Sequence, residues 1–171
     1  MTIKIWARVP SPGDVLDVAR AMRAMDRREI LALHKNLDAD LFAAVVSAQV
    51  PRARAALGFG LDGNPFCAVV LLICGSESTP WLGEASLFAT DAFPRLAGPL
   101  TRYVRRRLIP ALLADGLRRV ECRALASYAQ TRRFLRACGA VEEAVLHDHG
   151  PDSPDYVLCA WRRRDFAQGG K

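Results

Sequence analysis

Arginine is the residue whose number and spacing in this chain most clearly indicate chemistry. The chain has 24 basic residues against 18 acidic ones, and only three of the basic residues are lysines. Between Asp91 and Cys138 there are eleven arginines and three acids, a local excess of +8 that exceeds the +6 of the whole chain. Such a concentration of positive charge favours an anionic partner. A solvated helix face is the alternative, and for any single arginine it is the simpler explanation.

The five cysteines give no sign of a catalytic thiol. They are Cys67, Cys74, Cys122, Cys138 and Cys159, and no C-x-x-C pair occurs among them. Each lies in an apolar run, and the sequence provides no nearby histidine of the kind that a catalytic cysteine needs. We therefore expect buried free thiols in a reducing compartment.

Two histidines at alternate positions, His147 and His149, raise the question of a metal site. Asp152 and Asp155 follow, but no third ligand has a fixed spacing and the run lies among glycine and proline residues. Metal sites need ligands at defined separations. The sequence therefore predicts a polar hairpin here and no metal ion.

Length and hydropathy limit the scaffold that can position these groups. The 171 residues, 51% of them hydrophobic, suit a single domain over the whole chain, 1–171, with a frayed tail at 166–171. The longest apolar stretch, 66–74, has the length of a strand, so no membrane span is expected. The first eight residues carry no hydrophobic signal core, and we expect a cytoplasmic protein.

The first half of the chain predicts a strand, two helices and three further strands. Residues 2–9 alternate as a half-buried strand, and Ser11 with Pro12 begins a helix that buries Val15, Val18, Ala19 and Met22. A second helix runs from about Asp38 to Pro51, with Leu41, Phe42, Val45, Val46 and Ala48 facing inward. Strands follow over 53–60, 64–74 and 81–90, the first two joined by an Asp62-Gly63 turn.

The second half predicts alternating helices and strands. Gly98-Pro99 opens a long helix, which Pro110 kinks or divides and Gly116 ends. A strand at 118–124 precedes a helix that a capping box at 127–130 begins and Gly139 ends. Strands at 141–147 and 156–161 close the chain.

The predicted order is therefore β-α-α-β-β-β-α-β-α-β-β, an α/β fold with one mixed sheet and helices on both faces. The connection from strand 81–90 through the long helix to strand 118–124 must be a right-handed crossover. We expect those two strands to lie parallel and side by side.

This order resembles the fold of the GNAT family of N-acetyltransferases, over roughly Thr2 to Phe166. The segment 132–143, RRFLRACGAVEE, looks like the last helix and following strand of that family, often R-x-F-Y-x-x-x-G-F-x-x-E. Pro80-Trp81-Leu82, then Ala89-Thr90-Asp91 and the arginine-rich helix, look like a phage-encoded branch. Members of that branch are often described as internal virion or acetyltransferase-like proteins.

The resemblance implies an acyl-CoA site where strand 81–90 meets the long helix. The family has a turn R/Q-x-x-G-x-G/A there, whose backbone N–H groups bind pyrophosphate at a helix N-terminus. The matching cofactor residues are Arg95, Leu96, Ala97 and Gly98, with Arg102 as a further contact. Leu100 replaces the second small residue of the turn and Pro99 lacks an N–H, so the turn is degenerate. A helix start with a solvated basic face is the equal alternative.

The resemblance also implies two catalytic positions. The family often places a general base on strand 81–90, where Glu84 is the only acid. It often uses a tyrosine on the last helix as the acid toward the CoA thiolate, and that position is Leu135 here. Tyr128 lies at the start of the helix and is the remaining candidate hydroxyl. An exposed strand position for Glu84 and simple packing for Tyr128 are the alternatives.

The function implied is acyl-CoA-dependent N-acetyl transfer, with acetyl-CoA as cosubstrate, an unknown amine as acceptor and no metal. The alternative is a non-catalytic GNAT-fold protein of a phage virion, or one that binds a host protein, in the host cytoplasm or the virion. We do not expect a nucleic-acid or membrane partner, since the arginine-rich helix lacks interleaved aromatics and a helix-turn-helix pattern.

Overall fold

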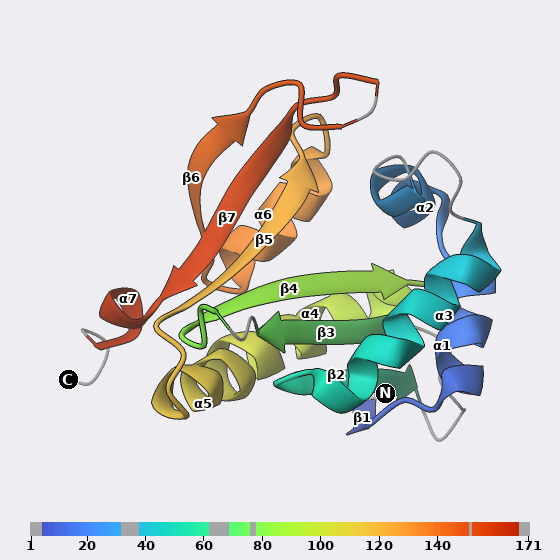
Figure 1. The fold of residues 1–171 in the computed structure, drawn as a ribbon, viewed down its shortest axis with the longest axis horizontal. Helices are drawn as coiled ribbons and strands as arrows, with labels where there is room; N and C mark the ends of the chain where they lie inside the picture. Colours follow the sequence, from blue (N-terminus) through green and yellow to red (C-terminus); the bar gives the residue numbers. More distant parts are fainter. Residues whose placement is uncertain (1–4, 32–37, 62–68, 76–77, 151, 168–171) are drawn as a thin grey trace. The chain divides into compact units, whose positions relative to one another are not determined.

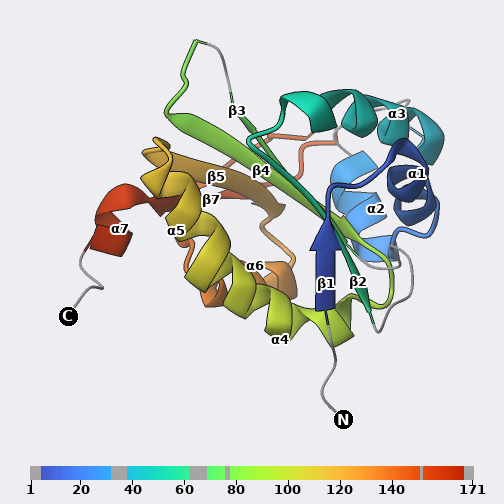
Figure 2. The same cartoon turned by 90° about the horizontal axis from the view of Figure 1, so that it is seen from below.

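The computed structural model describes residues 5–31, 38–61, 69–75, 78–150 and 152–167 (Figures 1 and 2). Its elements, in chain order, are β1 (Ile5–Arg8), α1 (Pro12–Arg20), α2 (Ala24–Leu31), α3 (Ala39–Gln49), η1 (Val50–Arg52), β2 (Ala55–Leu61), β3 (Val69–Gly75), β4 (Leu82–Ala89), α4 (Phe93–Tyr103), η2 (Val104–Leu108), α5 (Ile109–Ala114), β5 (Arg119–Leu125), α6 (Ala129–Ala137), β6 (Val141–Leu146), β7 (Tyr156–Arg162) and α7 (Arg163–Ala167). The predicted order is confirmed with two additions, α2 and α7. The predicted Asp62-Gly63 turn lies outside the described residues.

The strands form one mixed sheet in the order β1-β2-β3-β4-β5-β7-β6. β2 pairs antiparallel with both β1 and β3, as the predicted meander requires. β4 and β5 are parallel neighbours, with Leu82 opposite Arg119 and Glu84 opposite Glu121. β7 then pairs antiparallel with β5 on one side and β6 on the other. The predicted α/β class and the parallel crossover are therefore confirmed.

The chain divides into two compact units, and the first comprises residues 1–74 and 86–98. Its α1 begins as predicted. Ser11 caps the helix, its hydroxyl accepting from the Asp14 N–H while the Asp14 carboxylate accepts from the Ser11 N–H at 2.7 Å. One face of α1 is buried in a core made of Val15, Val18, Ala19, Met22, Ala43, Val46, Ala56 and Phe88.

The inward face predicted for α3 is partly wrong. Leu41 and Val45 are exposed, at 51% and 45%, while Ala43 and Val46 are buried. Phe42 does face inward, its ring meeting that of Phe88 edge-on at 4.9 Å. Apolar residues occur on nearly every side of this helix, so their spacing does not identify which side is buried.

The second unit comprises residues 75–85 and 99–171. The long helix predicted from Gly98-Pro99 begins earlier, at Phe93, so Pro99 lies inside α4 and the predicted start is wrong. The interruption predicted at Pro110 is real. Residues 104–108 form a π-turn, in which the Ile109 N–H bonds to the Val104 carbonyl, and α5 follows with Pro110 in its first turn. Because proline donates no hydrogen bond, the helix rearranges immediately before it.

Glycines end α5 and α6 as predicted. Gly116 after α5 and Gly139 after α6 have φ values of +112° and +93°, a conformation that other residues rarely adopt. The capping box predicted at 127–130 does not form, because α6 begins one residue later, with Tyr128 at its N-cap and no side-chain cap bond. In the described part of the chain, no helix is long and apolar enough to cross a membrane.

Candidate functional site

The structure places the predicted cofactor residues on α4. Arg95, Leu96, Ala97 and Gly98 lie in its first two turns, and Arg102 lies in its last turn. Leu96 is fully buried, so its side chain belongs to the core, whereas Arg95, Gly98 and Arg102 are exposed. Apart from the neighbouring backbone of α4 itself, no described atom lies within 4 Å of where a side chain on Gly98 would begin, so this surface is open.

The backbone at the start of α4 offers few donors to a phosphate. The Ala92 N–H donates to the Thr90 hydroxyl at 3.3 Å, and the Phe93 N–H donates to the Thr90 carbonyl at 3.0 Å. Pro94 has no N–H, and the Arg95 N–H donates to the Ala92 carbonyl at 3.1 Å. The N–H groups that make a helix start attractive to anions are therefore already used here. What remains for a phosphate is side-chain charge.

A buried ion pair lies beside this helix start, within the first unit. Asp26 on α2 is 3% exposed, pairs with Arg23 at 2.7 Å and accepts from the Ala89 N–H at 2.8 Å. The Arg23 guanidinium also lies over the Phe93 ring, 4.1 Å from its centroid. Burial raises the pKa of Asp26, although the bonds from Arg23 and from the Ala89 backbone oppose the rise. The pair thus joins α2 to the end of β4.

The predicted base, Glu84, lies on β4 in the second unit. Its carboxylate pairs with the Arg123 guanidinium of β5. The Glu84 side chain is 57% exposed and that of Arg123 is 34% exposed. Glu84 thus takes the exposed strand position that was the alternative, and Trp81 is also exposed, at 46%. Glu84 is available to solvent and to an approaching substrate.

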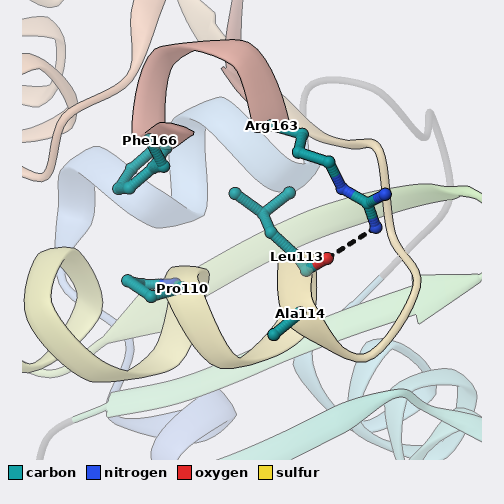
Figure 3. A pocket seen from close by; sticks show the side chains of 5 residues that line it. All are labelled: Pro110, Leu113, Ala114, Arg163 and Phe166. Carbon is teal, nitrogen blue, oxygen red and sulfur yellow. Dashed lines mark hydrogen bonds between the residues drawn. The ribbon is translucent and has the colours of Figure 1, made fainter. Parts of the chain in front are cut away.

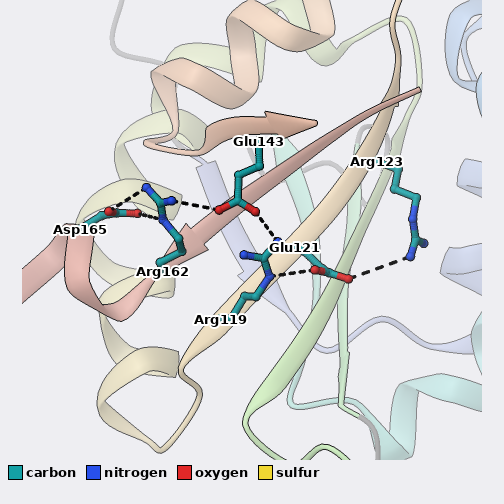
Figure 4. A network of polar contacts seen from close by, with 6 residues as sticks. All are labelled: Arg119, Glu121, Arg123, Glu143, Arg162 and Asp165. Atoms are coloured by element: carbon teal, nitrogen blue, oxygen red, sulfur yellow. Dashed lines mark hydrogen bonds and ion pairs between the residues drawn. The ribbon is translucent and has the colours of Figure 1, made fainter. Parts of the chain in front are cut away.

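Arg123 connects Glu84 to a network of charges on one face of β5, β6 and β7 (Figure 4). Its further members are Arg119, Glu121, Glu143, Arg162 and Asp165. Arg119 donates to both Glu121 and Glu143, at 2.8 and 2.5 Å, and hydrogen bonds from Arg119 lower the pKa of Glu143. Because each acid has an arginine partner, the charges largely neutralise one another.

Tyr128, the second catalytic candidate, is the N-cap residue of α6 and is partly buried. The rest of α6 follows the family-like motif. Arg132 holds both carboxylate oxygens of Glu142 on β6, at 3.0 and 2.7 Å, and donates to the Ala126 carbonyl at 3.1 Å. This double contact lowers the pKa of Glu142. Arg132 of the motif and the neighbouring Glu142 are therefore a structural clamp between α6 and β6, whereas Glu143, the glutamate of the motif, pairs with Arg119 and Arg162.

A hollow of about 450 Å³ lies at the end of α5, lined by Pro110, Leu113, Ala114, Arg163 and Phe166 (Figure 3). Arg163 donates to the Leu113 and Leu117 carbonyls at 2.6 and 3.0 Å. The Leu113 carbonyl is one of the acceptors that the end of α5 leaves without partners, and Leu117 lies just beyond that helix. The only charged group in the hollow therefore caps a helix, and we assign the hollow no chemistry.

The polar hairpin predicted around the histidines connects β6 to β7. His147 pairs with Asp155 at 2.9 Å, and the His149 ring meets the Tyr156 ring edge-on. Over the described residues, no three His, Cys, Asp or Glu side chains gather as metal ligands do. Cys122, Cys138 and Cys159 are buried free thiols, as predicted, while the structure does not describe the side chains of Cys67 and Cys74.

Two polar features of the structure were not predicted from the sequence, namely the charge network on β5, β6 and β7 and the buried Asp26. For the network, a signal was present, because Arg119, Glu121 and Arg123 alternate along β5 and must share a face. For Asp26, no signal was available. It stands in a highly charged segment, MDRRE, that reads as solvated, and only the tertiary structure buries it.

Comparison of the sequence with protein-family profiles and with curated proteins finds no match. Comparison with solved structures finds the GNAT acetyltransferase fold. A GNAT-family acetyltransferase from Streptococcus pneumoniae shares 16% identity over 93% of this chain and 99% of that one, with a TM-score of 0.65. An aminoglycoside acetyltransferase in complex with coenzyme A shares 15% identity over 98% of this chain and 100% of its own, with a TM-score of 0.67. The ribosomal-protein-S5-alanine acetyltransferase of Vibrio fischeri shares 16% over 94% of each chain, with a TM-score of 0.63.

The predicted fold is thereby confirmed, since this chain is a single α/β domain of the GNAT type with a mixed central sheet. Identities this low establish the fold alone. They provide no support for the phage-encoded branch that Pro80-Trp81-Leu82 suggested, and the substrates of the similar proteins are not transferred with the fold.

Proposed function

We propose that this protein is an acyl-CoA-dependent N-acetyltransferase that moves an acetyl group from acetyl-CoA to an amine. The observation that carries the proposal is the parallel β4–β5 pair, connected through α4 and α5, in a fold shared with a coenzyme A complex. The thioester supplies the driving force, and the protein needs to hold the two substrates together and to remove a proton. We place the activity in the cytoplasm, in keeping with the described free thiols.

In this proposal Glu84 is the general base. It is the only acid on β4, and its exposed carboxylate can take a proton from an ammonium group directly or through water. Arg123 holds the carboxylate in position until the amine arrives. Tyr128, at the N-cap of α6, is the candidate hydroxyl for the departing thiolate, and Leu135 cannot serve because it has no acidic proton.

Binding of the CoA phosphates would depend on side chains more than on backbone. Arg95 and Arg102 are exposed on α4, and the open surface beside Gly98 lets a phosphate approach the helix. Ala97 and Leu96 would contribute only through the helix that they build. Because the first N–H groups of α4 are bonded internally, we expect binding that salt weakens strongly.

A second candidate function is a GNAT-fold protein without catalysis, in a phage virion or bound to a host protein. Two observations favour it over the enzyme. The N–H groups at the start of α4 are occupied, and Leu135 stands where the family-like motif often has tyrosine. Neither feature prevents acetyl-CoA binding, so the two functions differ in turnover.

Turnover is therefore the test. The purified protein is incubated with acetyl-CoA and a panel of primary amines, including aminoglycosides, polyamines and peptide N-termini, and acetylated products are identified by mass. We expect transfer to at least one amine, a loss of about 100-fold in Glu84→Gln, and a much smaller loss in Tyr128→Phe. Acetyl-CoA binding with no transfer to any amine, and no response to either substitution, would favour the non-catalytic protein.

A further inference from the structure

Two of the buried cysteines lie directly opposite each other on neighbouring strands. Cys122 of β5 and Cys159 of β7 form one rung of the antiparallel pair. Cys159 is completely buried and Cys122 is 7% exposed. Because residues directly opposite on an antiparallel pair project to the same face, the two thiols are near neighbours. The proposed acetyl transfer uses neither residue.

The register of this rung satisfies the geometry of a disulfide. Residues directly opposite in an antiparallel pair have Cα atoms about 4.5 or 5.5 Å apart, depending on the hydrogen-bonding position. Disulfides span Cα separations of about 4.4–6.8 Å. A bond between Cys122 and Cys159 therefore needs no change of register and little movement of either strand.

The surroundings of the pair favour a thiolate at Cys159. The hydrogen bond from Cys122 lowers its pKa, an effect that burial opposes and that Arg132 and Arg136 of α6 support. Glu142, which lies opposite Cys159 on β6, acts the other way, but both arginines already hold its carboxylate. A thiolate is the form of cysteine that reacts with oxidants.

An oxidant can reach the pair because α6 is held to β6, beside Cys159, by the ion pairs of Arg132 and Arg136 with Glu142 and not by buried packing. The arginines that influence Cys159 belong to α6, and α6 has no fully buried side chain. Helices with few buried contacts open locally at low free energy. A small hydroperoxide needs only such an opening, without global unfolding.

We propose that Cys122 and Cys159 are a redox-active pair that hydrogen peroxide converts to a disulfide. The Cys159 thiolate attacks the peroxide, an S–O bond forms as the O–O bond breaks, and the leaving hydroxide takes a proton to become water. The Cys122 sulfur then attacks the sulfenic sulfur, forming the S–S bond, and the S–O bond breaks. The released oxygen leaves as a second water with two protons, one from Cys122. The bond would close the chain from 122 to 159, which contains α6 and β6.

Cys138 is the matched internal control. It is buried like the pair, but its sulfur meets the Thr101 hydroxyl at 3.9 Å instead of a second thiol. Burial raises the pKa of Cys138 to about 11, against which the Thr101 contact works only partly. We expect Cys138 to stay reduced under conditions that oxidise the pair.

The experiment treats the full native protein with hydrogen peroxide, quenches it, alkylates the remaining thiols in urea and maps the peptides without reduction. Trypsin leaves Cys138 and Cys159 on one peptide, 137–162, so a second protease that cuts at the acids 142–155 is needed. We expect one linked peptide joining Cys122 to Cys159, with Cys138 alkylated, in both the wild type and Cys138→Ser. In Cys122→Ser, a dimedone adduct is expected on Cys159.

Two results would overturn the proposal. One is a native protein whose Cys122 and Cys159 remain alkylatable while the same peroxide treatment cross-links the urea-unfolded chain. The other is a mixture of disulfides in which Cys138, Cys67 or Cys74 joins as often as the pair. A dimedone adduct that appears on Cys122 in Cys159→Ser, but not on Cys159 in Cys122→Ser, would contradict the order of the two steps.

Discussion

Two ion pairs contact β4, and they differ in burial and in hydrogen bonding, which determine how much an ion pair contributes to stability. Asp26 and Arg23 meet at 2.7 Å with side chains 3% and 13% exposed, and Asp26 also accepts from the backbone at Ala89, the last residue of β4. Glu84, in the same strand, pairs with Arg123 at side-chain exposures of 57% and 34%. The first pair is an internal part of its unit, whereas the second faces water.

The difference in burial between the two pairs indicates which acid can react with a substrate and which cannot. A buried, paired carboxylate that also holds a backbone N–H has no free direction from which a substrate can approach, and its removal disturbs the fold. An exposed carboxylate contributes little to stability but can exchange its partner for a substrate. The buried acid is therefore structural here, and the proposed base is the acid that faces solvent.

The largest expected effect is on stability, from breaking the buried pair. Arg23→Ala leaves Asp26 buried without its counter-ion, and we expect unfolding free energy to fall by about 3–5 kcal/mol. Urea denaturation followed by circular dichroism measures it. Arg20→Ala is the matched control, since Arg20 on α1 holds Asp40 on α3 by two bonds of 2.8 Å in full solvent. If both substitutions lowered the unfolding free energy equally, burial would not be the reason that the Arg23–Asp26 pair stabilises the fold.

Next in size is the effect on turnover from the exposed pair. Glu84→Gln keeps the shape of the side chain and removes the base, so we expect turnover to fall by about 100-fold. Its urea midpoint should stay near that of the wild type, because an exposed ion pair adds little stability. Kinetics and denaturation on the same preparation check both. A large loss of stability with unchanged turnover would reverse the roles assigned to Glu84 and Asp26.

A smaller effect concerns pH. The folded-state pKa of Asp26 is raised above that of the unfolded chain, so the folded protein binds this proton more tightly. Its contribution to stability is fully present below about pH 4, where unfolded aspartate titrates, and is lost as pH rises through the raised folded pKa. Compared with Asp26→Asn, the wild type should lose stability over that interval and then level off. Parallel urea midpoints from pH 3.5 to 7 would contradict the raised pKa.

The smallest effect is on ligand affinity. Arg102→Ala and Arg95→Ala should each weaken acetyl-CoA binding by about threefold at low salt, the scale of one exposed charge interaction, and the difference should shrink at high salt. Arg164→Ala, an exposed arginine on α7, is the control and should leave affinity unchanged. If all three substitutions weaken binding equally, general positive charge attracts the ligand and α4 provides no specific site.

The sequence predicted the scaffold better than the site. Ser11, Gly116 and Gly139 act on their own neighbours, so local rules placed the ends of α1, α5 and α6. The same local rules wrongly placed the start of α4 at Pro99. Proline is common in the first turn of a helix, and only tertiary packing of the residues before it, including Phe93 and Leu96, extends α4 backwards.

The polar site depended on contacts that no local pattern contains. Arg123 meets Glu84 across the crossover from β4 to β5, 39 residues apart, and Asp26 meets the Ala89 backbone 63 residues away. The alternation of β5 could have predicted the shared face of Arg119, Glu121 and Arg123, but not which acids would join them. Burial of Asp26 could not have been predicted, because a partner three residues earlier, Arg23, is equally typical of a solvated helix face.

Titration of acetyl-CoA into the purified protein by calorimetry, first at low salt and then at 0.15 M or more, tests most directly the claim on which turnover depends, that the chain binds this cosubstrate. The proposed N-acetyltransferase should bind about one acetyl-CoA per chain saturably at low salt, and the affinity should fall as salt is added, because side-chain charge on α4 replaces the occupied backbone donors. A folded protein that shows no saturable binding at low salt would contradict the proposed function.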